Sequence, residues 1–184
     1  MNTIGLDMFH YAKITKDDTT GVTYETPVSV PGLRKFNITV NGSNSTLFAD
    51  NGPWETAASL GKIATAIEMA ELGLEHQAAL LGHTVTKGVL EKKATDEAPY
   101  VAIMCRATKG NGKHAYIKIL KTRFTEPSTE VDTKEENVAF KTPTINGEAV
   151  QRKYDKGWMR VADEDATGYE DVSTSWFASV DATV

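Results

Sequence analysis

The sequence predicts a mainly β fold arranged as one domain. Most segments alternate apolar and polar residues with a period of two, which is typical of half-buried strands. Helical periodicity is confined to two short segments. The chain has 184 residues, of which 40% are hydrophobic and 24% charged, and this length and composition suit one globular domain with a full core. We therefore treat residues 1–184 as a single domain.

Two early segments have the alternation expected of strands with one buried face. Residues 34–41 (RKFNITVN) place apolar side chains on one face and polar side chains on the other, and residues 62–69 (KIATAIEM) repeat the pattern. The expected buried faces consist of Phe36, Ile38 and Val40, and of Ile63, Thr65, Ile67 and Met69. The stretch between these strands, 41–61, is the longest turn-like connection in the chain. A long connection inside a compact domain usually has a function.

The second half of the chain supplies the expected central strands. Residues 100–107 (YVAIMCRA) are apolar on both sides, which indicates a central strand. Residues 114–124 follow after a Gly-Asn-Gly turn, so we expect a hairpin in which Lys118 points away from its isoleucine neighbours. Further strands are expected within 138–153 and 158–162, for a total of roughly eight.

The clearest helix lies in residues 74–82. Leu74, Ala78 and Leu81 recur at helical spacing, which places them on one face. Gly82 stands where a left-handed residue would end the helix. A second short helix is expected in 173–180 (STSWFASV).

His76 and His83 lie at this helix and just beyond its end. A zinc site needs three or four clustered ligands, and neither a cysteine nor a third histidine lies nearby in the sequence. We therefore interpret both histidines as structural, packing the helix and stabilising its end. No metal and no cofactor are expected.

Two further motifs resemble ligand-binding loops without matching them. ATKGNGK (107–113) is close to a phosphate-binding loop, but His114 replaces the magnesium-binding hydroxyl and no helix is expected to follow. DEDATGYED (163–171) is close to a calcium loop, but it lacks the bidentate glutamate. We interpret the first as a hairpin turn and the second as an acidic, solvated turn. Because no catalytic set is marked by local context, we expect no enzyme.

Composition excludes several classes of protein. The formal charge of −5 is not that of a general nucleic-acid binder. No apolar run approaches the roughly 18 residues of a membrane span, and residues 1–13 lack the pattern of a signal peptide. The single cysteine, Cys105, is expected to be a buried apolar residue and not a reactive thiol. These features fit synthesis in a reducing cytoplasm.

Charge is arranged in blocks along the second half of the chain. Residues 98–125 carry six basic residues and no acidic one, whereas 126–136 and 163–171 carry five acidic residues each. Three interpretations are open. The blocks pair within the monomer, they pair across subunits and set the register between copies, or a basic hairpin contacts nucleic acid.

Five segments form an ordered pattern along the chain. They are LFADNGPWETAASLG (47–61), LEHQAALLGHTVTKGVL (74–90), APYVAIM (98–104), FKTPTINGEAV (140–150) and WFASV (176–180). Their order and spacing, from YAKIT near the N-terminus onward, resemble the major tail protein, or tail tube protein, family of bacteriophages with long, non-contractile tails. The resemblance extends over nearly the whole chain.

This resemblance implies a β-sandwich or small barrel with one flanking helix, for which 74–82 is the candidate. It also implies that six copies form a ring, that their inner sheets join into one ring-wide β-barrel, and that stacked rings form the tube through which DNA passes. The implied partners are further copies of the chain and the tape measure, tail-tip and tail-terminator proteins. The implied location is the virion tail, after assembly in the host cytoplasm. Many relatives carry an added immunoglobulin-like domain, which this chain is expected to lack.

The resemblance gives the 41–61 segment a role, because in the family a long loop between two early strands reaches the neighbouring ring. Leu47, Phe48, Trp54 and Glu55 then become candidate inter-subunit contacts. Trp54 is the first choice, since aromatic residues tend to anchor interfaces. The alternative is that Trp54 folds back onto its own core.

Two other functions remain open at this point. One is a subunit of a related injection or secretion tube, and the other is a monomeric β-barrel that binds a small apolar ligand under a 41–61 cover. For a tail tube we expect transient, non-specific contact with DNA and a neutral to acidic lumen, because tight phosphate binding would retard passage. Most of four basic side chains are then expected away from the channel wall: Arg106, Lys113, Lys118 and Arg123.

Overall fold

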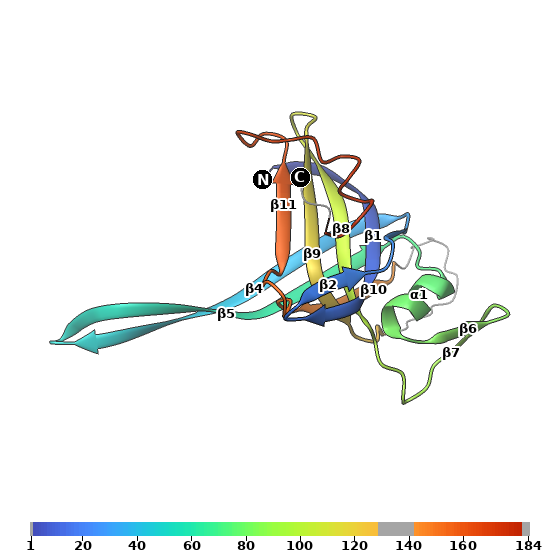
Figure 1. Ribbon diagram of the computed structural model, residues 1–184, viewed down its shortest axis with the longest axis horizontal. Helices are drawn as coiled ribbons and strands as arrows, with labels where there is room; N and C mark the ends of the chain where they lie inside the picture. The colour runs from blue at the N-terminus through green and yellow to red at the C-terminus, as the bar shows by residue number, and fades with distance from the viewer. Residues whose placement is uncertain (1, 129–141, 182–184) are drawn as a thin grey trace, which may run out of the picture.

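The computed structural model describes residues 2–128 and 142–181. Its elements in chain order are β1 (Thr3–Asp18), β2 (Gly21–Tyr24), β3 (Val28–Ser29), β4 (Leu33–Ala49), β5 (Gly52–Met69), α1 (Leu74–Leu81), β6 (Thr84–Thr86), β7 (Val89–Glu91), β8 (Tyr100–Lys109), β9 (His114–Phe124), β10 (Thr144–Ala149) and β11 (Met159–Asp163). The expected mainly β fold with one helix beside the sheet is confirmed (Figure 1).

The main sheet is open. Its strands follow the order β2-β1-β8-β9-β10-β5-β4, with β3 paired to β1 and β11 paired to β9. β6 and β7 form a separate two-stranded hairpin beside α1 (Figure 1). The sheet does not close into a barrel. Of the two architectures that the resemblance implies, the small barrel is therefore not formed within the monomer.

Two hydrophobic clusters cover the two faces of β8 and β9. The first lies among β1, β5, β8, β9, β10 and α1, and it includes Phe9, Ile63, Ile67, Leu80, Val101, Ile103, Ile119 and Ile145. The second lies under the C-terminal segment, and it includes Ala102, Met104, Tyr116, Leu120, Val172, Trp176, Phe177 and Val180. The central position expected for 100–107 is confirmed. β9 is likewise buried on both faces. Lys118 points away from Ile119, as expected, and lies buried against Trp176 of the second cluster.

Helix α1 begins and ends close to the expected residues. It covers Leu74–Leu81, and Gly82 follows with a φ of 80°. A residue with a side chain is strained in that conformation, which explains the glycine. The second expected helix is wrong, because residues 173–178 form turns. Single backbone bonds such as Trp176 N–H to the Val172 carbonyl (2.8 Å) form there, but they do not propagate into a helix.

Strand β1 is long and was not singled out by its sequence pattern. Met8 has a φ of 55°, and the pairing of β1 with β8 shifts register between Asp7 and His10. This irregularity interrupts the two-residue alternation on which the recognition of strands depends.

Two buried cations hold the C-terminal segment on the body. The Lys118 ammonium donates to the carbonyls of Ser179 (3.0 Å) and Val180 (2.9 Å) and lies 4.4 Å from the centre of the Trp176 ring. Burial lowers the pKa of Lys118 to about 8, because desolvation penalises the charged amine. The segment is therefore fixed by polar contacts as well as by its apolar side chains.

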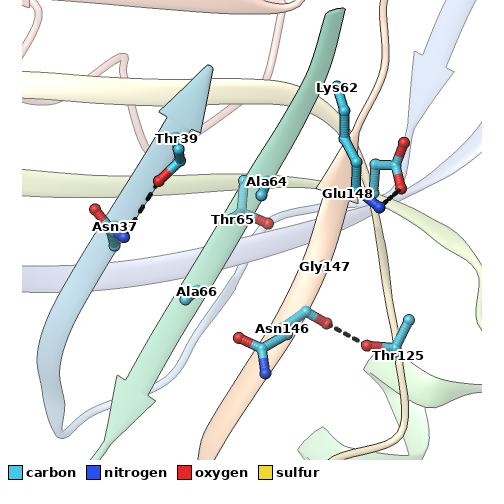
Figure 2. A pocket seen from close by; sticks show the side chains of 10 residues that line it. All are labelled: Asn37, Thr39, Lys62, Ala64, Thr65, Ala66, Thr125, Asn146, Gly147 and Glu148. Carbon is cyan, nitrogen blue, oxygen red and sulfur yellow. Dashed lines mark hydrogen bonds and ion pairs between the residues drawn. The ribbon is translucent and has the colours of Figure 1, made fainter. Parts of the chain in front are cut away.

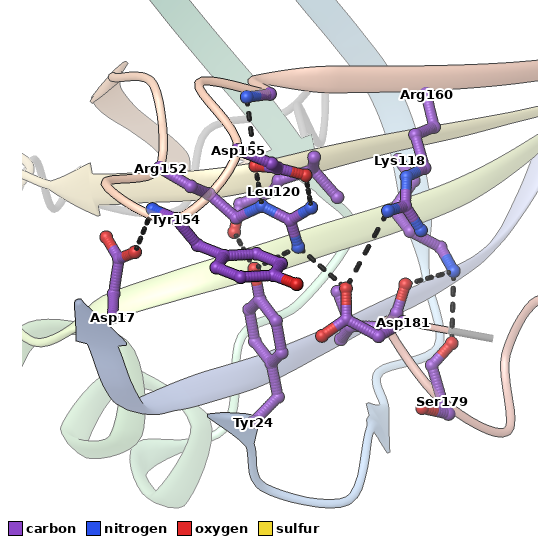
Figure 3. Close-up of polar contacts among 12 residues, drawn as sticks. Asp17, Tyr24, Lys118, Leu120, Arg152, Tyr154, Asp155, Arg160, Ser179 and Asp181 are labelled. Carbon is purple, nitrogen blue, oxygen red and sulfur yellow. Dashed lines mark hydrogen bonds and ion pairs between the residues drawn. The ribbon is translucent and has the colours of Figure 1, made fainter. Parts of the chain in front are cut away.

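The second cation is Arg152. Its guanidinium pairs with Asp155, donates to Asp181 (2.7 Å) and reaches the Tyr24 hydroxyl at 3.2 Å (Figure 3). The Tyr24 hydroxyl donates in turn to the Leu120 carbonyl at 2.9 Å. A charge this deeply buried is tolerated because its donors are paired.

Candidate subunit interface

Strands β4 and β5 continue beyond the body as a two-stranded arm, residues 41–61 (Figure 1). The expected irregular connection over this range is therefore corrected to a regular hairpin. At its tip Asp50 and Asn51 both have positive φ, 51° and 62°, and Ala49 pairs with Gly52. Two successive residues of positive φ are typical of a type I′ turn, whose twist matches that of paired strands.

A bulge marks the base of the arm. Val40 pairs with Ile63, but the next pair joins Gly42 to Leu60, so β5 has one residue more than β4 here. A Cβ atom on Gly61 would lie 2.0 Å from the carbonyl oxygen of Asn41. Only glycine allows this close approach, and bulges of this kind change the direction of a strand.

The shaft of the arm, which we define as residues 42–46 and 56–60, has small and mainly polar side chains on both faces. Its sequence reads GSNST on β4 and TAASL on β5. The hydroxyls of Ser43 and Ser59 hydrogen-bond across it at 2.8 Å. The arm as a whole contains no basic residue. The loop-like composition of the shaft explains why its sequence did not indicate strands.

The tip of the arm carries the predicted contact residues. Leu47, Phe48 and Trp54 are 60%, 70% and 69% exposed. Glu55 pairs with Leu47, and Trp54 is the unopposed residue of a second irregularity in the ladder. The structure thus brings all four predicted residues to one end of the arm. Trp54 does not fold back onto its own core.

A polar surface covers the outer side of the β4–β5–β10 layer. A shallow groove of about 310 Å³ lies there, and its lining includes Asn37, Thr39, Ala66, Asn146 and Thr125 (Figure 2). At its edge the Lys62 ammonium and the Glu148 carboxylate form an ion pair of 2.6 Å. The polar positions of the alternating segments 34–41 and 62–69 contribute part of this surface, and the sequence pattern indicated them. The contribution of β10 was missed, because strand neighbours far apart in sequence leave no local signal.

The acidic turn at 163–171 pairs with basic residues of the same chain. The Lys109 ammonium contacts both Asp163 and Asp165, and Lys113 lies 2.9 Å from Asp165. The hydrogen bond from Lys109 lowers the pKa of Asp165 most strongly. Pairing within the monomer is thus confirmed for this block. The segment forms an acidic turn with mostly exposed residues, as expected. Most of the 126–136 block lies outside the described residues.

The other basic side chains of 98–125 are also engaged. Arg106 forms a two-pronged pair with Asp7, at 2.9 and 2.6 Å, and Lys118 is buried. The Arg123 guanidinium stacks 4.2 Å from the centre of the Tyr100 ring. The basic block is therefore largely neutralised or enclosed within one subunit.

His83 clamps three segments of the chain. Its Nδ1 lies 2.8 Å from Asp96, and its Nε2 lies 2.8 Å from Glu126. The hydrogen bond with Asp96 raises the pKa of His83, and Glu126 adds to the effect. His76 packs edge-on against Tyr11, with their rings 6.0 Å apart. The structural interpretation of both histidines is confirmed.

The remaining chemical groups can be placed briefly. Cys105 is buried as expected, and burial raises the pKa of its thiol to about 12. The 107–113 segment comprises the end of β8 and the β8–β9 turn, with Gly112 at a φ of 83°. Within residues 2–128 and 142–181, no group of three or more His, Cys, Asp or Glu side chains is arranged to hold a metal ion. Nor does any described helix have the length and apolar character needed to cross a membrane.

These features define a structural subunit: an open β body, a projecting arm, and an apolar tip that is exposed among the described residues. They contradict the ligand-binding barrel, since no barrel closes and the arm extends away from the body instead of covering it (Figure 1). A family model described as phage tail tube protein matches residues 3–180. The chain therefore belongs to the phage tail tube protein family and is a structural component of the virion tail. A comparison with curated proteins finds no match.

Proposed function

We propose that six copies of this chain form a ring and that stacked rings form the tail tube through which phage DNA passes. The observation that carries this proposal is the arm, because its apolar tip is exposed and has no partner among residues 2–128 and 142–181. Assembly takes place in the host cytoplasm, and the tape measure, tail-tip and tail-terminator proteins are the further partners.

The tip of the arm is the proposed contact with a neighbouring subunit. Leu47, Phe48 and Trp54 gather at the end of a hairpin, where they contact no core of their own subunit. Exposed apolar groups on a soluble protein mark interaction sites, and buried aromatic residues contribute most to many interfaces. Trp54 is therefore the proposed anchor, and Glu55 lies at its rim.

The charge distribution supports a lumen that is neutral to acidic. Arg106 and Lys113 are neutralised by carboxylates, and Lys118 is enclosed. An exposed basic wall would bind phosphates and release counterions, which slows a moving polyanion. DNA contact is accordingly transient and independent of sequence.

Electron microscopy and light scattering of the purified chain test the proposal. We expect rings or hollow tubes for the natural sequence, and for Trp54→Ala we expect assembly only at a concentration at least about tenfold higher. The matched control is Val89→Ala, because Val89 is an apolar residue that is 66% exposed on the β6–β7 hairpin, away from the arm. This variant should assemble normally. Persistence of the natural chain as a monomer, even with tail-tip components added, would contradict the proposal.

A further inference from the structure

We propose that Asn51, in the turn that closes the arm, is a deamidation site, and that its conversion withdraws an unassembled subunit from tube assembly. The reacting groups are the side-chain amide of Asn51 and the backbone nitrogen of Gly52. The consequence for assembly rests on the proposed function and adds to it a chemical limit on how long a free subunit stays competent.

The chemistry needs only the chain and water. The backbone nitrogen of Gly52 attacks Cγ of Asn51, so a bond between these two atoms forms while the bond from Cγ to Nδ2 breaks. Ammonia leaves with the side-chain nitrogen and the proton of the Gly52 nitrogen, and a cyclic succinimide remains. Water then opens one of the two ring carbonyls, which gives aspartate or isoaspartate. Glycine favours the attack because it has no side chain to obstruct it.

The sequence offers more than one candidate for this reaction. Four asparagines are followed directly by glycine, namely Asn41, Asn51, Asn111 and Asn146. The attack requires a side-chain amide without competing hydrogen bonds and a backbone that can open locally, and both conditions depend on the fold. The structure therefore separates the four sites, which the sequence does not.

Two of the four are held by the body. The Asn111 amide donates to Asp165 at 3.0 Å, and its side-chain oxygen accepts the Lys113 N–H at 3.1 Å. Asn146 and its glycine lie in β10, which pairs with both β5 and β9, and the Asn146 carbonyl accepts the Thr125 N–H at 2.8 Å. Because the attack would first have to break these contacts, both sites should react slowly.

Asn41 is an intermediate case. It is exposed, but it lies inside β4, between the Val40–Ile63 pair and the Gly42–Leu60 pair. The ladder therefore holds the backbone on both sides of the site. An attack there requires the strand to leave its extended conformation in the middle of the paired region.

Asn51 is the least restrained of the four. It is exposed, and its side chain makes no hydrogen bond within the part of the chain that the structure describes. The Ala49–Gly52 pair is the last of the ladder, so this pair alone has to open, and chain ends and loop tips open most readily. A Cβ atom on Gly52 would meet nothing within 4 Å, which shows that the backbone has room to move.

Conversion at Asn51 changes the tip of the arm. Either product adds a negative charge beside Asp50, and enclosing an unpaired charge in an apolar contact is costly. Isoaspartate also lengthens the main chain, which a two-residue type I′ turn does not accommodate. Leu47, Phe48 and Trp54 then lose the arrangement that the ladder gives them. In a tube the tip is enclosed and the turn is held, so only free subunits are converted.

Peptide mapping by mass spectrometry, on the natural chain kept as a dilute monomer at mildly alkaline pH, tests the site. We expect Asn51 to convert at least about tenfold faster than Asn111 and Asn146, with Asn41 between them and isoaspartate among the products. In Gly52→Ala the added methyl group obstructs the attack, so conversion at Asn51 should slow by at least about tenfold. Conversion at any of the other three sites as fast as at Asn51 would overturn the inference.

Light scattering of the same samples, before and after ageing, tests the consequence. The aged natural chain should need at least about tenfold more protein to assemble than the fresh chain, whereas aged Gly52→Ala should stay within about threefold of its own fresh sample. Unimpaired assembly of the converted chain would overturn the limit on assembly and leave the proposed function standing. A fresh chain that never assembles would overturn both, while the order of conversion among the four sites would still decide whether Asn51 is the reactive one.

Discussion

Replacing Trp176 by alanine should destabilise the monomer by about 3–5 kcal/mol. Trp176 is a buried member of the second hydrophobic cluster. Its ring lies 6.1 Å from that of Tyr116 and beneath the Lys118 ammonium. Truncation of a buried aromatic residue typically costs this amount, because the free energy of burying the removed atoms is lost and a cavity remains in their place. The lost cation–π contact is part of the same total.

Replacement by phenylalanine provides the matched control. The indole N–H of Trp176 has no hydrogen-bond partner among the described residues, so its removal leaves no new unpaired group. Trp176→Phe keeps an aromatic ring under Lys118 and should cost less than about 1.5 kcal/mol.

Urea unfolding followed by circular dichroism, below the assembly concentration, measures both variants. For a domain of this size the alanine variant should also melt about 10 °C lower. Equal and small losses for the two variants would refute the reasoning, because they would mean that the C-terminal segment does not cover the core.

Two further predictions concern His83 and the base of the arm. The raised pKa of His83 means that its pairs stabilise the fold fully below its ordinary pKa of 6.5 and that this contribution is lost as pH rises through the folded value. His83→Gln should therefore lower the unfolding free energy more at pH 6 than at pH 9, as measured by urea titration. An equal loss at the two pH values would contradict a stabilising role for the His83 pairs with Asp96 and Glu126. Gly61→Ala should prevent tube formation, because its Cβ would collide with the Asn41 carbonyl, whereas Gly21→Ala in β2, whose Cβ would meet nothing within 4 Å, should assemble. Electron microscopy distinguishes the two, and tubes of normal yield from Gly61→Ala would show that the bulge is dispensable.

Local pattern predicted the elements whose residues follow one uninterrupted pattern. The strands at 34–41 and 62–69 follow from alternation, the strand at 100–107 follows from a continuous apolar run, and the helix at 74–82 follows from helical spacing and one terminal glycine. The pattern failed at 173–180, where apolar spacing compatible with a helix serves instead to press a turn-rich segment onto the sheet. It gave the direction of Lys118 in its strand but not its burial, because burial depends on the distant C-terminal segment that covers it.

The candidate interface was predicted through family resemblance and not through local physics. Leu47, Phe48, Trp54 and Glu55 were placed on a loop, and the structure places them on a hairpin. Serine, threonine, asparagine and glycine give the shaft the composition of a loop. Its strand character comes from pairing across the hairpin, which no single-strand pattern contains.

The sequence by itself determined the mainly β class, the helix at 74–82 with its glycine end, and the apolar character of the arm's tip, since these depend on residues near one another in the chain. Tertiary structure decided the rest. It paired Lys109 with Asp163 and Asp165, enclosed Lys118 and Arg152 beneath the C-terminal segment, and left both edges of the shaft bare. The physical reason is that burial, ion pairing and edge exposure depend on which distant segments meet, and those contacts exist only once the chain has folded.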